Sequence, residues 1–132
     1  LSILSRGGLL ATLGIELVEL TRERVTATMP VTAALHQPFG YMHGGASVSL
    51  AETVASVGAN MNCPPGKAAF GLEINANHVR PVRDGMLTAV GLPAHIGRTS
   101  QVWQITIYDE HGRTVCLSRC TLAHIDLIAD NR

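Results

Sequence analysis

The segment Gly44–Met61, GGASVSLAETVASVGANM, decides the fold of this chain of 132 residues. It contains no proline, and small or apolar side chains occupy almost all of its positions. A helix that is apolar nearly all round is typical of a protein interior, because a surface helix keeps one polar face. Pro64, Pro65 and Gly66 follow shortly afterwards and predict its end. We therefore expect one long helix that is buried rather than lying on the surface.

The residues that precede this helix predict a short helix and a hairpin. Residues 1–13 are expected to form the short helix, which Gly14 closes. Two strand-like runs follow at 15–20 and 25–31, on either side of a polar turn. Apolar and polar residues alternate in the second run, as in a strand with one buried face. A loop is expected over residues 32–42, before the long helix begins.

Four further strands are expected after the helix, at 68–79, 86–96, 99–108 and 113–125. In the third of them, Trp103, Ile105 and Ile107 fall on one face. Short turns join the last three strands, which predicts an antiparallel meander. No repeat, linker or low-complexity tract divides the chain. The order of elements predicts a single α+β domain over residues 1–132, with an antiparallel β-sheet wrapped around one central α-helix.

The composition narrows the class of protein. Hydrophobic residues make up 46% of the chain and charged residues 15%, which supplies enough apolar material for one core and argues against disorder. Lys plus Arg is 10 and Asp plus Glu is 10, so the formal net charge is +0. A balanced chain lacks the excess basic charge of nucleic-acid-binding proteins, and it has little charge repulsion against self-association.

Three cysteines, Cys63, Cys116 and Cys120, form an odd and unpatterned set. Such a set is expected to remain as reduced thiols rather than to form a disulfide framework. No basic and then apolar leader opens the sequence. The longest weakly charged stretch, 44–66, contains too many Ser, Asn, Gly and Pro residues for a transmembrane helix. We therefore expect a soluble, cytoplasmic protein.

Glu52 is the one carboxylate of the expected central helix. Burying a carboxylate without a partner costs several kcal/mol, so its presence there needs an explanation. Ser56 follows four residues later on the same helix face, and the pair could hold a water molecule or position a carboxylate for attack. A structural explanation is equally compatible with the pattern, in which Glu52 points outward at a helix end or pairs with an arginine.

Gly44 and Gly45 lie where the long helix begins. The unpaired N–H groups of a helix N-terminus and the helix dipole favour negative charge, and glycine lets a ligand approach the backbone. This is a candidate oxyanion site for acyl transfer, with Gln37 and His43 as further hydrogen-bond donors. Taken alone, a Gly-Gly pair is more often a tight turn, and a histidine before a turn is more often structural.

Other chemistries lack their sequence patterns. The chain contains no G-x-S-x-G, H-E-x-x-H or C-x-x-C motif and no phosphate-binding P-loop. The six histidines are scattered, which predicts that no metal is bound. Cys116 and Cys120 alternate on an expected strand, where packing in the core explains them better than catalysis.

A longer pattern combines the residues at the start of the helix: Q-P-F-G-x-x-H-G-G-x-S-x-x-L-A-E-x-x-A-S-x-G-A, over residues 37–59. It resembles the hotdog-fold thioesterases of the phenylacetate-pathway (PaaI-like) type. Within them it is most similar to the branch of aryl-CoA, dihydroxynaphthoyl-CoA and siderophore-proofreading thioesterases. The resemblance continues through 75–78, 80–81, 97–103 and 116–122, so it spans nearly the whole chain. It implies a hotdog fold and an acyl-CoA thioesterase, which is a thioester hydrolase.

The resemblance also implies roles for individual residues. Gln37 and the N–H of Gly44 would polarise the thioester carbonyl, and His43 would support that arrangement. Glu52, reaching in from a neighbouring subunit, would attack the carbonyl or activate water, and Ser56 would orient the water. Five further residues are expected at the substrate. Phe39 would line the acyl group, and His78 would lie near the acyl group or the pantetheine. The remaining three would contact the CoA portion: Arg80, Thr99 and Ser100.

By the same resemblance, the reaction needs no metal and no cofactor apart from the coenzyme A of the substrate. The expected acyl group is small and aromatic, carried by CoA or by an acyl carrier protein. Two copies would share active sites as a homodimer, which would assemble further into a homotetramer, without a nucleic-acid or membrane partner. Two other functions remain open: a non-catalytic acyl-CoA-binding or sensor module, and a hotdog enoyl hydratase or dehydratase.

Overall fold

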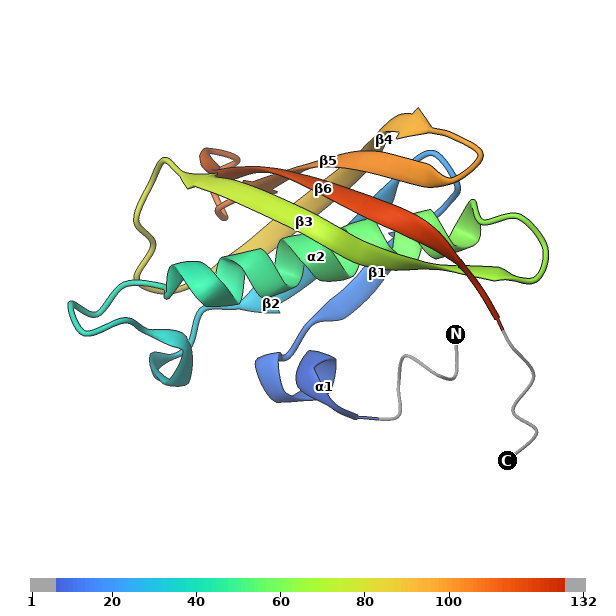
Figure 1. The fold of residues 1–132 in the computed structure, drawn as a ribbon. Coiled ribbons are helices and arrows are strands. Elements are labelled where there is room, and N and C mark those ends of the chain that lie inside the picture. Colours follow the sequence, from blue (N-terminus) through green and yellow to red (C-terminus); the bar gives the residue numbers. More distant parts are fainter. Residues whose placement is uncertain (1–6, 128–132) are drawn as a thin grey trace.

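The computed structural model describes residues 7–127, and Figure 1 shows a curved antiparallel sheet wrapped around one long helix. This is the hotdog-type α+β fold that the sequence predicted. The elements are, in chain order, α1 (Leu9–Leu13), β1 (Glu16–Leu20), β2 (Val25–Pro30), the 3₁₀ helix η2 (Ala33–Leu35), α2 (Gly44–Met61), β3 (Lys67–His78), β4 (Met86–Ile96), β5 (Ser100–Tyr108) and β6 (Thr114–Asp126).

The central helix α2 begins and ends where the sequence predicted. His43 is its N-cap residue, and the ring Nδ1 accepts a hydrogen bond from the Gly45 N–H at 2.8 Å. Near the other end, the Asn60 amide donates to the Ala69 carbonyl at 3.1 Å and accepts from the Ala69 N–H at 2.9 Å. These two bonds attach the last turn of α2 to β3, so the helix is held under the sheet by polar as well as apolar contacts.

The sheet has six strands in the order β1-β2-β4-β5-β6-β3, and all neighbouring pairs are antiparallel. Strands β4, β5 and β6 form the predicted meander. β3 returns to pair with β6 along its whole length, with one shift of register between Gly71 and Glu73. Such a bulge bends an edge strand locally and leaves one residue without a partner.

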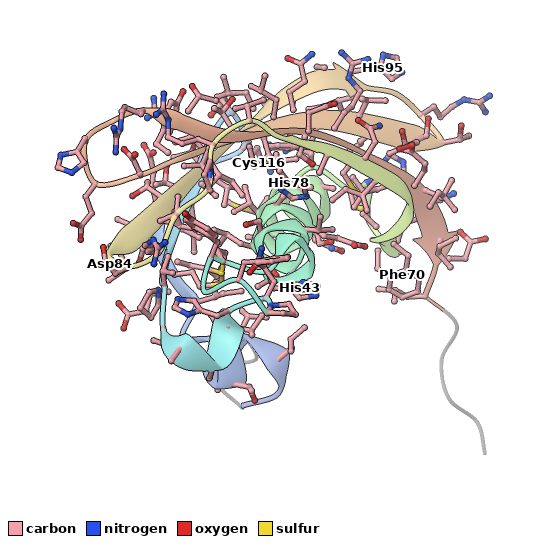
Figure 2. The ribbon with its side chains drawn as sticks, turned by 90° about the vertical axis from the view of Figure 1, so that its left-hand side faces the viewer. His43, Phe70, His78, Asp84, His95 and Cys116 are labelled. Carbon is pink, nitrogen blue, oxygen red and sulfur yellow. The ribbon has the colours of Figure 1, made fainter. Side chains whose placement is uncertain are left out.

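β3 forms one edge of the sheet. It is long for an edge strand, at 12 residues, and its Phe70 and Leu72 side chains are 58% and 67% exposed. Figure 2 shows Phe70 at the outer margin of the molecule. A long edge strand with exposed apolar side chains is a template for pairing with another chain. The free edge of β3 is therefore the part of the sheet best suited to self-association.

The core lies between α2 and the concave face of the sheet. Trp103 and Ile105 are buried there, as the alternation along their strand predicted. Gly58 of α2 makes room for the indole, because a Cβ at this position would overlap the Trp103 ring. Cys116 and Cys120 are also buried, which confirms that they pack in the core.

The predicted burial of α2 is confirmed on the side that faces the sheet, while the other side is only half buried. Leu50, Val54 and Ala55 face the sheet and are fully buried, whereas Glu52 and Ser56 lie on a face that is only half buried. One sheet covers one side of a helix, and on the opposite side the short helices α1 and η2 lie beside α2 (Figure 1). A second, partly open helix face is thus left at the position of the carboxylate.

The N-terminal helix is shorter than predicted. Helical residues are Leu9–Leu13, while Gly7 and Gly8 precede the helix in non-helical conformations and residues 1–6 lie outside the described part. Gly14 closes the helix with a φ of 74°, as expected from a glycine at this position. The strand ends differ from the predicted ones by at most one residue. No helix within residues 7–127 is long and apolar enough to cross a membrane.

Candidate active site

Gln37 lies in the loop that leads into α2, and this loop fixes its side chain. The Gln37 Oε1 atom accepts hydrogen bonds from the backbone N–H groups of Phe39 and Tyr41. Because two donors occupy the oxygen, the Nε2 group of the same amide is left to donate elsewhere. Gln37 lines a hollow of about 300 Å³ together with Gly44 and His78, which we call the Gln37 hollow. Its amide can therefore donate to a ligand bound there.

Gly44 forms the first turn of α2 at the wall of the Gln37 hollow. Among the described residues its N–H has no hydrogen-bond partner, as expected at the start of a helix. His78, at the end of β3, packs against it so closely that a Cβ on Gly44 would lie 2.9 Å from His78 Nε2. The Gln37 hollow thus combines two N–H donors with the positive end of the α2 dipole, an arrangement that stabilises an oxyanion.

His43 lies outside the Gln37 hollow. Figure 2 looks toward the start of α2 and shows His78 above the helix and His43 below it. The Nδ1 atom of His43 is occupied by the Gly45 N–H, so the ring proton is on Nε2. His43 lines a separate, mostly apolar depression beside Leu13 and Leu35. The geometry gives His43 a structural role at the first turn of α2, through which it positions Gly44.

Glu52 lies in a second hollow of about 310 Å³, which we call the Glu52 hollow. Ser56 lines it from the next turn of α2, and Leu9, Leu10 and Val57 form its apolar wall. Within residues 7–127 the Glu52 carboxylate has no hydrogen bond and no ion pair, so the pairing with arginine that the sequence left open is not found there. A carboxylate next to apolar side chains and without a partner is free to act as a nucleophile or as a proton acceptor.

Cys120 lies in the core behind Glu52. Burial raises the pKa of its thiol to about 12, with further contributions from the negative charges of Glu52 and Glu73. Burial likewise raises the pKa of the Cys116 thiol. Thiols with raised pKa values stay protonated at neutral pH and are poor nucleophiles. The raised pKa values therefore argue against Cys116 and Cys120 as nucleophiles.

The Gln37 and Glu52 hollows are separate places on one chain. Gly44 and Glu52 are eight residues apart on α2, which corresponds to about 12 Å along the helix axis. If the Gly44 N–H holds the carbonyl oxygen of a thioester, the carbonyl carbon lies only about 1.2 Å from that oxygen. The carboxylate of the same chain is too far away to attack that carbon. Neither hollow of a single chain therefore contains both the oxyanion donors and the carboxylate.

The residues predicted to bind substrate are distributed over the surface. His78 and Arg80 line the Gln37 hollow, and Arg80 is exposed there. Phe39 is 81% exposed on the loop before α2 and lines neither hollow. Thr99 lies in the turn between β4 and β5 and Ser100 is the first residue of β5, and they also line neither hollow. The single chain thus brings together two of these five residues, and the roles of all five stay predictions.

Sequence reasoning missed the contribution of α1 to the Glu52 hollow. Leu9 and Leu10 line this hollow, although they are more than forty residues from Glu52 in the sequence. An apolar pair in a short N-terminal helix was the available signal, but it does not indicate which surface the pair covers. No group of three or more His, Cys, Asp or Glu side chains that could hold a metal ion occurs among residues 7–127.

A hotdog-type sheet with a carboxylate on its central helix and oxyanion donors at that helix's N-terminus defines a class of thioester hydrolase. The model of the Thioesterase superfamily matches residues 39–116. The 1,4-dihydroxy-2-naphthoyl-CoA hydrolase of Listeria monocytogenes is 48% identical over 116 residues, which are 88% of this chain and 94% of that protein.

Solved structures agree with these sequence matches. The thioesterase HI1161 from Haemophilus influenzae has a TM-score of 0.91 and 44% identity, covering 99% of this chain and 91% of that one. The PaaI protein of Escherichia coli has a TM-score of 0.86 and 27% identity, covering 94% of this chain and 88% of that one. The chain belongs to the thioesterase superfamily and is a thioester hydrolase of the PaaI-like hotdog type, as the sequence predicted.

Proposed function

We propose that this protein hydrolyses small acyl-CoA thioesters in a site built by two copies of the chain. Gln37 and Gly44 of one copy would hold the carbonyl oxygen, and Glu52 of the other copy would act on the carbonyl carbon. The observation that carries the proposal is the separation of donors and carboxylate into two hollows of one chain. The name of the similar Listeria protein, 1,4-dihydroxy-2-naphthoyl-CoA hydrolase, supports the class of substrate.

The free edge of β3 supports a site made by two copies. His78 at the end of β3 packs against Gly44, and Gly71 in the middle of β3 lies beside Glu52. Antiparallel pairing of two β3 edges about a twofold axis brings the start of one strand opposite the end of the other. The Glu52 hollow of one copy then approaches the Gln37 hollow of the other, which would bring carboxylate and oxyanion donors together.

The proposed reaction uses these groups in sequence. The thioester oxygen accepts hydrogen bonds from Gln37 Nε2 and the Gly44 N–H, which makes the carbonyl carbon more electrophilic. Glu52 attacks this carbon, or it takes a proton from a water molecule that Ser56 orients for the attack. The two donors and the helix dipole stabilise the tetrahedral oxyanion. Collapse of this tetrahedral intermediate breaks the C–S bond, and the CoA thiolate leaves and takes up a proton. Where Glu52 itself attacked, water then hydrolyses the acyl–Glu52 bond and releases the acid.

A small aromatic acyl group suits the surroundings of Glu52. Leu9, Leu10 and Val57 form an apolar wall beside the carboxylate, and the hollow measures about 310 Å³. Apolar walls with a few polar groups are typical of sites that bind an uncharged, compact ligand. The carboxylate at one side of such a wall would face the thioester end of the acyl group.

The CoA portion of the substrate would extend from the Gln37 hollow. Arg80 lies at this hollow, where its guanidinium can pair with phosphate oxygens. His78, packed against Gly44, would lie next to the acyl group or pantetheine. Three further residues complete the proposed contacts: Phe39 at the acyl group, and Thr99 and Ser100 at the CoA portion.

Thiol release from a panel of acyl-CoA substrates tests the proposed function. The panel contains benzoyl-, hydroxybenzoyl-, phenylacetyl- and medium-chain acyl-CoA. We expect Glu52→Ala and Glu52→Gln to lower kcat by about 10²–10⁴-fold, because they remove the attacking or proton-accepting oxygen. Glu19→Gln, which removes a carboxylate in an exposed ion pair with Arg24, serves as the matched control and should retain wild-type turnover.

Three outcomes, one of them from an added hydration assay, would contradict parts of this proposal. Wild-type turnover by Glu52→Gln on its best thioester would contradict the role of the carboxylate. Binding of acyl-CoA by the wild type without release of any thiol would support a non-catalytic sensor. Hydration of an enoyl-CoA without thiol release would support a hydratase or dehydratase. Thioesters of an acyl carrier protein are tested in the same assay, because the acyl group can be carried by CoA or by a carrier protein.

A further inference from the structure

We infer that Gly71 is a positioning residue for the Glu52 carboxylate, and this inference rests on the proposed function of Glu52. A Cβ on Gly71 would lie 2.5 Å from Glu52 Oε2, whereas real Cβ atoms essentially never approach another atom within 3.0 Å. The carboxylate therefore occupies space that any other residue at position 71 would fill. Glycine at this position is what allows Glu52 to lie where it does.

The requirement at Gly71 is for space and not for an unusual backbone. The glycines with positive φ, among them Gly66 and Gly85, do not include Gly71. An L-residue could adopt the backbone conformation of Gly71 without strain. The absence of a side chain is thus explained by the neighbouring carboxylate, and not by the turn chemistry that usually explains glycine.

The contact with Gly71 also determines in which direction the carboxylate points. Within residues 7–127, no hydrogen bond or ion pair holds Glu52 elsewhere. Gly71 lies at the bulge where the register of β3 with β6 shifts, on the edge strand of the sheet. The missing side chain leaves room for the carboxylate beside β3, the edge strand that the proposed function pairs with a second copy.

A methyl group at position 71 would disturb the site more than the fold. It would meet the far end of a flexible side chain, so Glu52 can move aside while the backbone stays in place. A displacement on the order of 1 Å in a catalytic group lowers a rate by up to about 10²-fold. Gly71 lines neither hollow, so substrate binding should change little. The expected signature is a fall in kcat with an unchanged KM.

A double-mutant cycle in the thiol-release assay tests the inference. We expect Gly71→Ala to lower kcat by about 10²-fold while KM stays within about twofold. Glu52→Asp withdraws the carboxylate by one methylene and lowers kcat by itself. Adding Gly71→Ala to Glu52→Asp should then lower kcat by less than about twofold, because the methyl group and the carboxylate no longer meet. Wild-type kcat in Gly71→Ala, or two losses that simply multiply, would overturn the inference.

Stability provides a second readout, which holds even where the single variant is too unstable for kinetics. The steric conflict exists only when the Glu52 side chain is present. Gly71→Ala should therefore cost less free energy of unfolding in a Glu52→Ala background than in the wild type, as measured by urea denaturation. Equal costs in the two backgrounds would overturn the inference. Ala68→Ser, which adds one atom elsewhere on β3, is the control and should leave kcat unchanged.

The same experiments distinguish this inference from the proposed function. Absence of turnover in the wild type, or full turnover in Glu52→Ala, would refute the proposed function itself. Loss of turnover in Glu52→Ala together with wild-type kinetics in Gly71→Ala would refute only the role of Gly71.

Discussion

At the scale of single residues, His43 shows how a residue of the PaaI-like motif can contribute by stabilising the first turn of α2. Its Nδ1 atom caps the N-terminus of α2 by accepting from the Gly45 N–H. Removing an N-cap acceptor typically costs about 1 kcal/mol. We expect His43→Ala to lower the free energy of unfolding by about that amount, and His43→Asn to restore most of it because asparagine is a good N-cap residue. Urea denaturation of the two variants measures the difference.

Turnover of the same two variants separates capping from chemistry. If His43 acts only by fixing the first turn of α2, His43→Asn should recover kcat together with stability. Recovery of stability without recovery of kcat would show that the His43 ring also contacts the substrate. Equal instability of both variants would refute the capping role.

The residues of the site differ in how far the sequence could predict them. Glu52 was recognisable because it is a lone carboxylate on an apolar helix, and the PaaI-like pattern supported its role. The contact of His78 with Gly44 and that of Glu52 with Gly71 join segments that are distant in the sequence. Contacts of this kind depend on the register of β3 against α2, which no local pattern contains.

At the scale of elements, a buried polar network connects α2 with β5 and β6. The Gln101 Nε2 group donates to the Ala59 carbonyl at 2.9 Å and lies 2.9 Å from His124 Nε2, and Gln101 Oε1 accepts from the Trp103 Nε1–H at 2.8 Å. His124 Nδ1 contacts the Arg98 carbonyl at 2.8 Å, so both of its ring nitrogens have partners. The last turns of α2 are therefore held to the sheet by a fully hydrogen-bonded group of side chains.

Breaking this network should destabilise the protein strongly. Gln101 is fully buried, and Gln101→Leu removes the hydrogen-bond partner of the Trp103 Nε1–H and of His124 Nε2. Each buried polar group without a partner costs about 1–3 kcal/mol, so we expect a loss of about 2–4 kcal/mol in urea denaturation. Gln104→Leu is the matched control on the exposed face of the same strand, and it should change stability by less than about 0.5 kcal/mol. A similar effect of both substitutions would contradict a special role for the network.

The elements themselves were largely predictable, and the exceptions have physical reasons. The limits of α2 follow from its unbroken apolar sequence and from Pro64, Pro65 and Gly66 after it. The half-open face of α2 was not predicted, because small residues such as Ala, Ser and Gly are equally acceptable in a core and on a half-open face. The Gln101 network was missed because its partners, Ala59 and His124, belong to other elements.

At the scale of the whole molecule, two surfaces built from residues 7–127 are left partly open. One is the free edge of β3, with the exposed Phe70 and Leu72 side chains. The other is the half-buried face of α2 that carries Glu52 and Ser56. A homodimer needs one interface and a tetramer with dihedral symmetry needs at least two. Two such surfaces on each chain are compatible with the homotetramer that the resemblance implies, in which the β3 edge would form the dimer that shares the active sites.

Mixing two inactive variants tests the shared site directly. Gln37→Ala and Glu52→Ala should each lose activity, the former by about 10²–10³-fold through loss of an oxyanion donor. In a mixed dimer, one of the two sites receives Gln37 from one chain and Glu52 from the other, and is intact. After unfolding and refolding together at equal concentration, about half of the dimers are mixed, so about a quarter of wild-type activity should return. A site contained within one chain would regain nothing, because every chain in the mixture lacks one of the two residues.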